Sequence, residues 1–556
     1  MPPAAGDGPG RALPAAGPPV CLGILGFVAN RGELLRRVGL PAGASDAELL
    51  LRLYGELGGG AAEAIAGPFA WLVWEPSRRR LVCASDRHGV HAPAYAFAGG
   101  AFRLAASVAG LLPRLAPFPG LDRRALAGHL AGEGPPRGGT FFERIAALES
   151  GEVLEVEDAR RRATRRYWSV AARPVCHGSD AEHAEAFREL LLRVSAEYLP
   201  AGAAGVTLSG GLDSTSVTAA LCAASHERPP VPFLWTTPEL PAADERAGSL
   251  AVCARYGLRP VEIRADLLWP LRHRDRPRTD SADPLVPHFD EVWDATFAAA
   301  RERGLRVLFT GAAGDNLFGG NAFAYPDLLL TGRWGALARQ LREHLPHSEI
   351  GLARVIRSMV LGPVLRAYLP RRARVPAPAW LGEEGRALLA DGFAEEPVPY
   401  RLLPGRKLHL RQMRERVLPR ITALLGRRAA AHGVELRHPL LDHRLFELAA
   451  ALPTSQLFRA ARRKVVVRNA MRPFLPAEVV ERRGKVYPVA IFERGARERE
   501  VQKMEALLTG MRAAELGLVD EGKLRAAYRD YRTGASRDAG FWRAVTLEAW
   551  LGKRLG

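Results

Sequence analysis

The stretch Val206-Thr207-Leu208-Ser209-Gly210-Gly211-Leu212-Asp213-Ser214-Thr215 decides the fold. Its first three residues are β-prone and predict a short buried strand. Ser209-Gly210-Gly211 follows, where side chains are smallest and backbone N–H groups can close around an anion. Ser214-Thr215 then open an alanine-rich helix that continues through 216–224. A strand, a small-residue turn and a helix N-terminus predict a phosphate site, because unpaired N–H groups and the helix dipole both favour negative charge.

The spacing of this loop separates it from two commoner phosphate loops, Gly-x4-Gly-Lys and Gly-x-Gly-x2-Gly. It resembles the pyrophosphate-binding loop Ser-Gly-Gly-x-Asp-Ser of the N-type ATP pyrophosphatases, which split ATP into AMP and pyrophosphate to activate a substrate. The alternative is an ordinary glycine turn, but the complete hexapeptide between a strand and a helix favours nucleotide binding. The resemblance implies that ATP is bound by Leu208, Ser209, Gly210, Gly211, Asp213, Ser214 and Thr215.

Composition predicts a globular protein of two or three domains. The chain has 556 residues, of which 47% are hydrophobic and 25% charged, as is typical of soluble proteins. No apolar run approaches the ~18 residues that span a bilayer, so no membrane contact is expected. The N-terminus lacks the basic and apolar regions of a secretory signal. The cysteines are scattered without a Cys-x2-Cys pair, which predicts a cytoplasmic location without zinc sites or disulfides.

The formal net charge of +18 could indicate a nucleic-acid partner. The basic residues are nearly all arginine, however, and abundant Ala, Gly and Pro accompany them, as is typical of GC-rich coding sequences. No basic stripe with interleaved aromatic residues and no nucleic-acid motif occurs. We therefore expect no nucleic-acid partner, and we expect runs such as 78–80 and 160–162 to be solvated surface.

Patterning divides the chain into two α/β parts. Residues 1–19 are rich in Pro, Ala and Gly and predict a disordered tail. Residues 20–172 predict a domain of short strands and glycine-rich turns, and a Pro-bearing linker follows at 171–179. Residues 180–556 predict a helix-rich α/β domain. Expected elements are strands at 21–29, 69–75, 80–84, 101–105, 151–157, 231–236 and 305–310 and helices at 47–57, 181–198 and 419–428.

A second glycine turn, Gly311-Ala312-Ala313-Gly314-Asp315, follows the expected strand at 305–310. In open α/β sheets, ligands bind outside the carboxyl ends of the strands. Asp213 and Asp315 both lie just past such ends, and two carboxylates there could hold Mg²⁺ against a triphosphate. We therefore expect Gly311 and Gly314 at the ATP site and Asp213 and Asp315 at the metal. The alternative for Asp315 is a helix N-cap.

Three later segments carry a resemblance to the asparagine synthetase family over nearly the whole chain. Residues 433–444 are similar to that family's Gly-Val-Glu-x-Arg-x-Pro-Phe-Leu-Asp segment, and 464–468 and 482–485 also match it. The resemblance implies an N-type ATP pyrophosphatase (PP-loop, Rossmann-like) domain in which Lys464 and Lys485 contact phosphates. Lys485 would neutralise charge on the α-phosphate and on departing pyrophosphate. The alternative for both lysines is an exposed surface position.

The N-terminal part resembles the glutaminase domain of the same family, which has the αββα N-terminal-nucleophile (Ntn) fold. Segments 67–71, 85–89 and 151–154 carry this likeness. Such a glutaminase needs an N-terminal cysteine whose own amine is the base. Leu22 stands at that position, and Cys21 is one residue early behind a 20-residue extension. The stretch that binds glutamine in relatives has no counterpart before the helix at 47–57, so we predict a degenerate domain that produces no ammonia.

Without a glutaminase, the attacking amine must come from elsewhere. In β-lactam synthetases and in lasso-peptide cyclases it belongs to the substrate, and His438-Pro439 is similar to these relatives. Ala312 stands where asparagine synthetases have Glu and β-lactam synthetases have the Tyr of a Tyr/Glu dyad, and helix 419–428 has no carboxylate for that dyad. A peptide N-terminal amine, with an ordinary pKa of about 7.7–8.0, needs no strong base. Glu435 and His438 remain possible bases, although Glu435 could simply pair with an arginine.

The favoured hypothesis is an ATP- and Mg²⁺-dependent lasso-peptide cyclase. It would adenylate an Asp or Glu side chain of a precursor (core) peptide and join it to the peptide's N-terminal amine, releasing AMP and pyrophosphate. By resemblance, a leader-recognition protein and a leader peptidase are its partners. The alternatives are a small-molecule amide ligase, similar to β-lactam synthetase or to ammonia-dependent asparagine synthetase, and a non-catalytic nucleotide-binding homologue.

Overall fold

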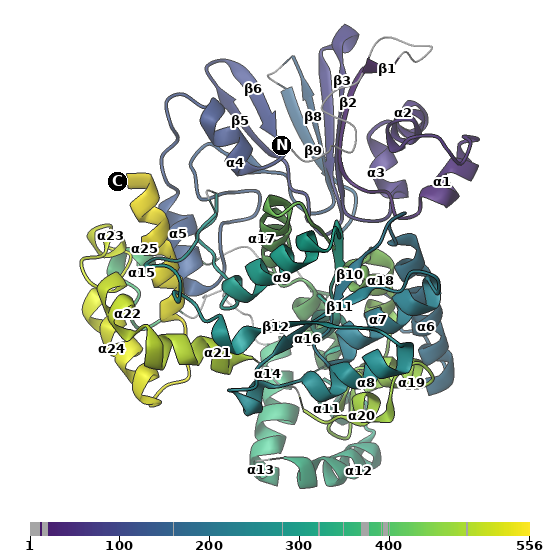
Figure 1. Cartoon of the computed structure of the whole chain (residues 1–556), viewed down its shortest axis with the longest axis vertical. Coiled ribbons are helices and arrows are strands. Elements are labelled where there is room, and N and C mark those ends of the chain that lie inside the picture. Colours follow the sequence, from purple (N-terminus) through teal and green to yellow (C-terminus); the bar gives the residue numbers. More distant parts are fainter. Residues whose placement is uncertain are drawn as a thin grey trace.

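The computed structural model describes residues 12–13, 20–158, 161–280, 282–320, 323–348, 350–368, 377–390, 392, 398–399, 401–484 and 488–555. It confirms the predicted fold class, since an antiparallel β domain precedes a helix-rich α/β domain with a parallel sheet (Figure 1). Among these residues, no helix is both long enough and apolar enough to cross a bilayer.

The N-terminal domain is built on a six-stranded antiparallel sheet with the order β1-β2-β3-β4-β8-β9. Its strands are β1 (Ala12–Leu13), β2 (Val20–Gly26), β3 (Phe69–Glu75), β4 (Arg80–Ser85), β8 (Glu152–Glu157) and β9 (Arg161–Arg166). Alternation along β3 turns Phe69, Trp71 and Val73 toward α2 (Asp46–Leu57) and α3 (Ala61–Ala64). The opposite face packs on a small sheet of β5 (Ala94–Ala98), β6 (Ala101–Ala105) and β7 (Ala146–Ala147), beside α4 (Val108–Leu111) (Figure 1).

Two expectations about this domain need correction. Ala12 and Leu13, within the expected disordered tail, pair with β2, because that strand's outer edge offers unpaired backbone groups; the rest of 1–19 lies outside the described residues. The expected strand at 21–29 ends at Gly26, whose φ of +79° takes the backbone out of the extended region.

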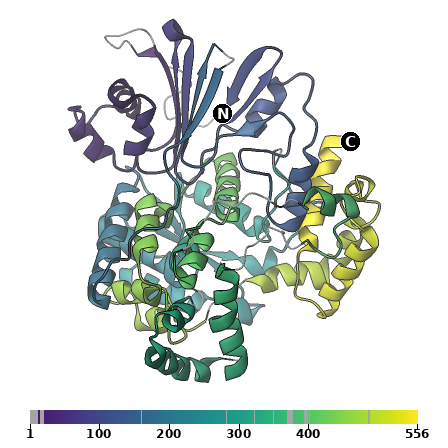
Figure 2. The ribbon, with the colours of Figure 1, turned by 180° about the vertical axis from the view of Figure 1, so that it is seen from behind.

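The C-terminal domain is organised around a five-stranded parallel sheet with the order β12-β11-β10-β13-β14. The strands are β10 (Gly205–Thr207), β11 (Val231–Thr236), β12 (Val261–Arg264), β13 (Val307–Phe309) and β14 (Glu435–Arg437). One face packs on α6 (Asp180–Glu197), α7 (Leu212–Ala224) and α8 (Arg246–Tyr256), and the other on α9 (Asp290–Glu302) and α17 (Val417–Ala431). Both views place α12 (Trp334–His344) and α13 (Leu352–Val355) at the end of the molecule away from the N-terminal sheets (Figure 2).

The two domains share a hydrophobic core. Helix α5 (Arg123–Ala131), which belongs to the N-terminal part of the sequence, packs against α25 (Phe541–Leu555) near the C-terminus. The rings of Phe141 and Phe142 lie 6.0 and 5.6 Å from the ring of Trp550, measured between centroids. The expected linker at 171–179 contains no helix or strand. The two domains therefore pack against each other through this shared core.

Candidate active site

The loop after β10 carries the first part of the site. Helix α7 begins at Leu212, two residues earlier than expected, so Asp213 lies in its first turn. The Ser209 N–H donates to Ser214 Oγ at 3.1 Å, which closes the loop. Gly210 has a φ of +66°, and a Cβ added there would lie 2.4 Å from the Glu245 carbonyl oxygen. Only glycine fits at this position without strain.

The loop after β13 packs directly against the first loop. A Cβ added at Gly311 would lie 2.7 Å from the Ser214 nitrogen, and one at Gly314 would lie 2.3 Å from Asp213 Cγ. The two glycines therefore allow a contact that no other residue permits. Asp315 follows in the first turn of α10 (Gly314–Phe318), whose N-cap is Ala313, so the N-cap alternative for Asp315 is wrong.

Lys464 joins the two loops. Its Nζ donates to Asp213 Oδ2 at 2.5 Å and lies 2.8 Å from Asp315 Oδ1. The residue is 8% exposed, so the alternative of a surface lysine is wrong. Its φ of +58° is uncommon for a side-chain-bearing residue and marks a strained position just before α19 (Val465–Met471). The two predicted metal ligands, Asp213 and Asp315, thus both contact one cation, the ammonium group of Lys464.

A cavity of about 460 Å³ opens beside these groups. One part of its wall is cationic and contains arginines that were not predicted as site residues: Arg462, Arg463, Arg468, Arg482 and Arg483. Burial, and after it the charges of Arg462, Arg463 and Arg483, lower the pKa of Arg468 to about 10. Their nearness in the sequence to Lys464 and Lys485 was the signal that could have identified these arginines as site residues. Apolar side chains line another part: Phe233, Trp235, Trp293, Leu418, Ile421, Leu425 and Leu436.

Most of the predicted site residues line this cavity. They are Leu208, Ser209, Gly210, Gly211, Asp213, Ser214, Gly311, Ala312, Asp315, His438 and Lys464. Gly314 is absent from the lining because it faces Asp213, and Lys485 lies outside the described residues.

Two of the predicted residues are positioned for other tasks. The Thr215 side chain is fully buried, and its hydroxyl donates to the Gly211 carbonyl at 2.9 Å, so it supports the helix rather than a ligand. Glu435 is also absent from the cavity lining. Its carboxylate pairs with Arg437 at 2.8 Å, as the alternative for this residue supposed.

His438 lies at the carboxyl end of β14 and is 5% exposed. Its Nδ1 is 2.7 Å from Thr310 Oγ1, which also accepts the Ala312 N–H at 3.2 Å. Burial lowers the pKa of His438 to about 4, so the ring is neutral at pH 7. A neutral imidazole next to the cavity can accept or pass a proton.

Leu22, which stands where the resemblance to glutaminases expects the nucleophilic cysteine, is part of the core. Leu22 lies inside β2, opposite Val73 of β3, and is 7% exposed. Its side chain packs in the cluster between the sheet and α2. Neither an accessible thiol nor a free amine occupies this position.

Comparisons with known proteins identify the family. The asparagine synthase family model matches residues 186–552, and a glutamine amidotransferase domain model matches 25–168. The chain belongs to the asparagine synthase family, whose members of this kind are ATP-dependent, amide-forming ligases.

The similar curated proteins are distant relatives. A Mycobacterium tuberculosis (strain ATCC 25618 / H37Rv) protein, assigned provisionally as a glutamine-hydrolyzing asparagine synthetase, is 26% identical over 84% of this chain and 74% of its own length. The amidase chyE of Penicillium rubens is 24% identical over 92% and 83%, respectively. The glutamine-hydrolyzing asparagine synthetase 3 of Bacillus subtilis (strain 168) is 24% identical over 80% and 70%.

Proposed function

We propose that this enzyme adenylates a carboxylate of a linear precursor peptide and joins it to the peptide's own N-terminal amine, forming an isopeptide macrolactam of the lasso-peptide kind. The observation that carries the adenylation step is the pair of carboxylates, Asp213 and Asp315, held by Lys464 beside an arginine-lined cavity. Cations arranged in this way stabilise the charge that develops on the phosphates as pyrophosphate leaves.

Magnesium fits the donor set as a cation shared with ATP. The described residues contain no group of three or more metal-ligating side chains, so the protein alone offers an incomplete shell. Mg²⁺ is commonly bound by one or two carboxylates together with phosphate oxygens and water. Asp213 and Asp315 would supply the protein ligands, and the ion would polarise the phosphates. Lys464 would then turn from the carboxylates toward a phosphate oxygen.

The substrate's own amine is the proposed nucleophile because the position of the glutaminase cysteine is filled by buried Leu22. Ala312 lines the cavity and offers neither the carboxylate nor the phenol of related enzymes, so the residues around it leave room for a larger substrate. The apolar part of the wall supports a peptide more than it supports free aspartate. A leader-recognition protein and a leader peptidase would deliver the peptide.

The decisive experiment follows pyrophosphate release and peptide mass together. The probe is the leaderless linear peptide encoded nearest the gene, with ¹⁸O in its side-chain carboxylates, tested with ATP and Mg²⁺. We expect peptide-dependent pyrophosphate release, ¹⁸O in AMP and a product lighter by one water. Asp213→Asn should abolish all three, whereas Lys523→Met, at an exposed ion pair, should not. Activity with a small amino acid alone would favour the small-molecule ligase, and no activity with any carboxylate would favour a binding protein.

A further inference from the structure

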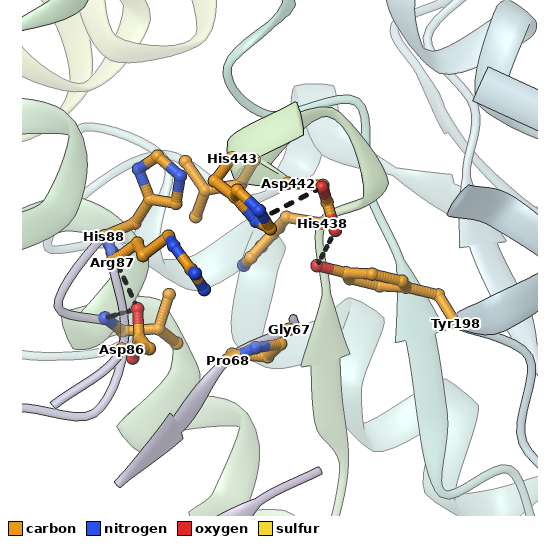
Figure 3. Close-up of a pocket in the computed structure, with 11 residues that line it drawn as sticks. Gly67, Pro68, Asp86, Arg87, His88, Tyr198, His438, Asp442 and His443 are labelled. Atoms are coloured by element: carbon orange, nitrogen blue, oxygen red, sulfur yellow. Dashed lines mark hydrogen bonds and ion pairs between the residues drawn. The ribbon is translucent and has the colours of Figure 1, made fainter. Parts of the chain in front are cut away.

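The N-terminal domain covers one end of the C-terminal domain and leaves the opposite end uncovered (Figures 1 and 2). Where the two domains meet, a chamber lined by Arg87, Tyr198, Asp442 and His443, among others, has a volume of about 20 Å³ (Figure 3). Such a volume admits one water molecule and nothing larger. A macromolecular partner has no access through this chamber, whereas the uncovered end is open to one.

Helices with a small core of their own form the uncovered end. They are α11 (Ala324–Leu330), α12 and a continuous helical run made of α13, a π-helix (Ile356–Leu361) and α14 (Gly362–Tyr368). Their inward faces pack together through Leu328, Leu337, Leu341, Val355 and Val360. The faces turned away from this core meet solvent. We call residues 330–366, which carry these outer faces, the tip segment.

Exposed apolar side chains are concentrated in the tip segment. Twelve large apolar side chains are exposed among the described residues, and five belong to the segment: Leu330, Trp334, Leu352, Leu361 and Leu365. Trp334 is 68% exposed, and its indole N–H donates to the Leu329 carbonyl at 3.2 Å, so the rest of the ring presents apolar surface to solvent. Leu361 and Leu365 are four residues apart in the helical run and share one face. Single exposed apolar residues are ordinary, but a concentration of them marks a contact surface.

Arginines alternate with these apolar residues along the tip segment. The segment contains six arginines and two glutamates, whereas the whole chain has 78 basic and 60 acidic residues. All six arginines are exposed, and none forms an ion pair with another described residue: Arg333, Arg339, Arg342, Arg354, Arg357 and Arg366. The local excess of positive charge is therefore larger than the composition of the chain explains, and it is available to an anionic partner.

We propose that the tip segment binds peripherally to the surface of an anionic lipid bilayer. The exposed tryptophan and leucines enter the boundary between headgroups and acyl chains, and the arginines contact lipid phosphates while their stems lie along the apolar layer. A protein partner would need shaped pockets for several separate side chains. A fluid bilayer accepts protruding side chains without such pockets, and its anionic headgroups match the charge of the arginines.

This mode of binding needs no membrane-spanning helix. The expectation of no membrane contact came from the absence of a long apolar run, which argues against a span but not against binding at the surface. The proposal is independent of the peptide substrate. It adds a location to the proposed function, since it would hold the enzyme at a lipid surface while the ATP cavity remains in water.

Vesicle sedimentation with the full chain tests the proposal. The probes are vesicles of phosphatidylglycerol and phosphatidylcholine in equal amounts, and vesicles of phosphatidylcholine alone, at 0.1 M NaCl. We expect the protein to bind the anionic vesicles more tightly, and high salt to weaken this binding. Arg354→Gln with Arg357→Gln should lower the partition coefficient about 25-fold, or about fivefold for each arginine. Leu361→Ser with Leu365→Ser should lower it about tenfold on the same vesicles.

Matched controls separate the tip segment from the general charge of the chain. Arg36→Gln with Arg37→Gln removes two exposed arginines of α1 (Arg31–Arg37), and Phe118→Ser removes a ring that is 53% exposed elsewhere. Both should leave partition within about twofold of the unsubstituted protein. Trp334→Phe should retain binding and lose the part of the fluorescence that brominated lipids quench. Pyrophosphate release without vesicles should be unchanged in every variant.

Three results would overturn the proposal. The first is an absence of binding to the anionic vesicles. The second is equal loss of binding in the tip variants and in the controls, which would assign the binding to the net charge of +18. The third is self-association without vesicles that the leucine substitutions abolish, which would assign the surface to a second copy of the chain. None of these results bears on amide formation, so the proposed function is tested separately.

Discussion

Gly314→Ala should misplace Asp213 without unfolding the protein. The added Cβ would lie 2.3 Å from Asp213 Cγ and 2.4 Å from Oδ1, whereas ordinary van der Waals contact begins at 3.4 Å. The carboxylate or the loop must therefore move by about 1 Å. A displacement of this size at a reacting centre costs about 10²-fold in rate. We therefore expect kcat for pyrophosphate release to fall about a hundredfold.

The assay is pyrophosphate release at saturating ATP and Mg²⁺, with unfolding followed separately by heat. Gly335→Ala is the matched control, because an added Cβ there meets nothing within 4 Å and Gly335 is an exposed residue of α12. That change should leave kcat unchanged and add up to about 1 kcal/mol of stability. If Gly314→Ala kept the original kcat, the close approach of the two loops would not fix the position of Asp213, and the reasoning would be refuted.

Three further predictions address other parts of the chain. Lys464→Met should lower pyrophosphate release about 10²–10³-fold, because one preorganised cation is lost; a variant with full activity would show that Nζ does not act on phosphate. Leu22→Cys should release no glutamate from glutamine, since the new thiol would be buried inside β2, and measurable glutamate would contradict this. Asp327 is buried with its pKa raised to about 6, so the folded state binds its proton more tightly than the unfolded state, and this stability is lost as pH rises through about 6. In urea titrations, the stability of Asp327→Asn relative to the unsubstituted protein should therefore increase between pH 4 and pH 7 by up to about 3 kcal/mol, and a constant difference would refute the assignment.

The sequence predicted those strands that have a distinctive composition of their own. The strands at 69–75, 101–105 and 231–236 match β3, β6 and β11. Each is a mostly apolar run bounded by turn residues, so the strand can be inferred from its own composition. Strand β9 was missed because four of its six residues, Arg-Arg-Ala-Thr-Arg-Arg, are charged and none is a large apolar residue. An edge strand can be charged because it need not enter the core, and its pairing with β8 is invisible in its own pattern.

In the candidate site, too, contacts between residues far apart in the sequence could not be predicted. The motif residues Asp213, Asp315 and Lys464 were predicted individually, and the structure brings them together. The ion pair that joins them could not be predicted from spacing, because it depends on how three distant loops pack. The cavity arginines were overlooked for a different reason. In a chain with so many arginines, composition gives no signal that separates a ligand-facing arginine from a solvated one.

The shared core gives the N-terminal domain a structural role in the rest of the molecule. Helix α5 packs against α25, and its buried His129 contacts the Arg543 carbonyl at 3.0 Å. Arg420 of α17 donates to His129 Nδ1 at 3.1 Å and to Asp283 at 2.6 Å. Helix α17 also lines the ATP cavity. The N-terminal domain therefore supports one wall of this cavity through direct contacts.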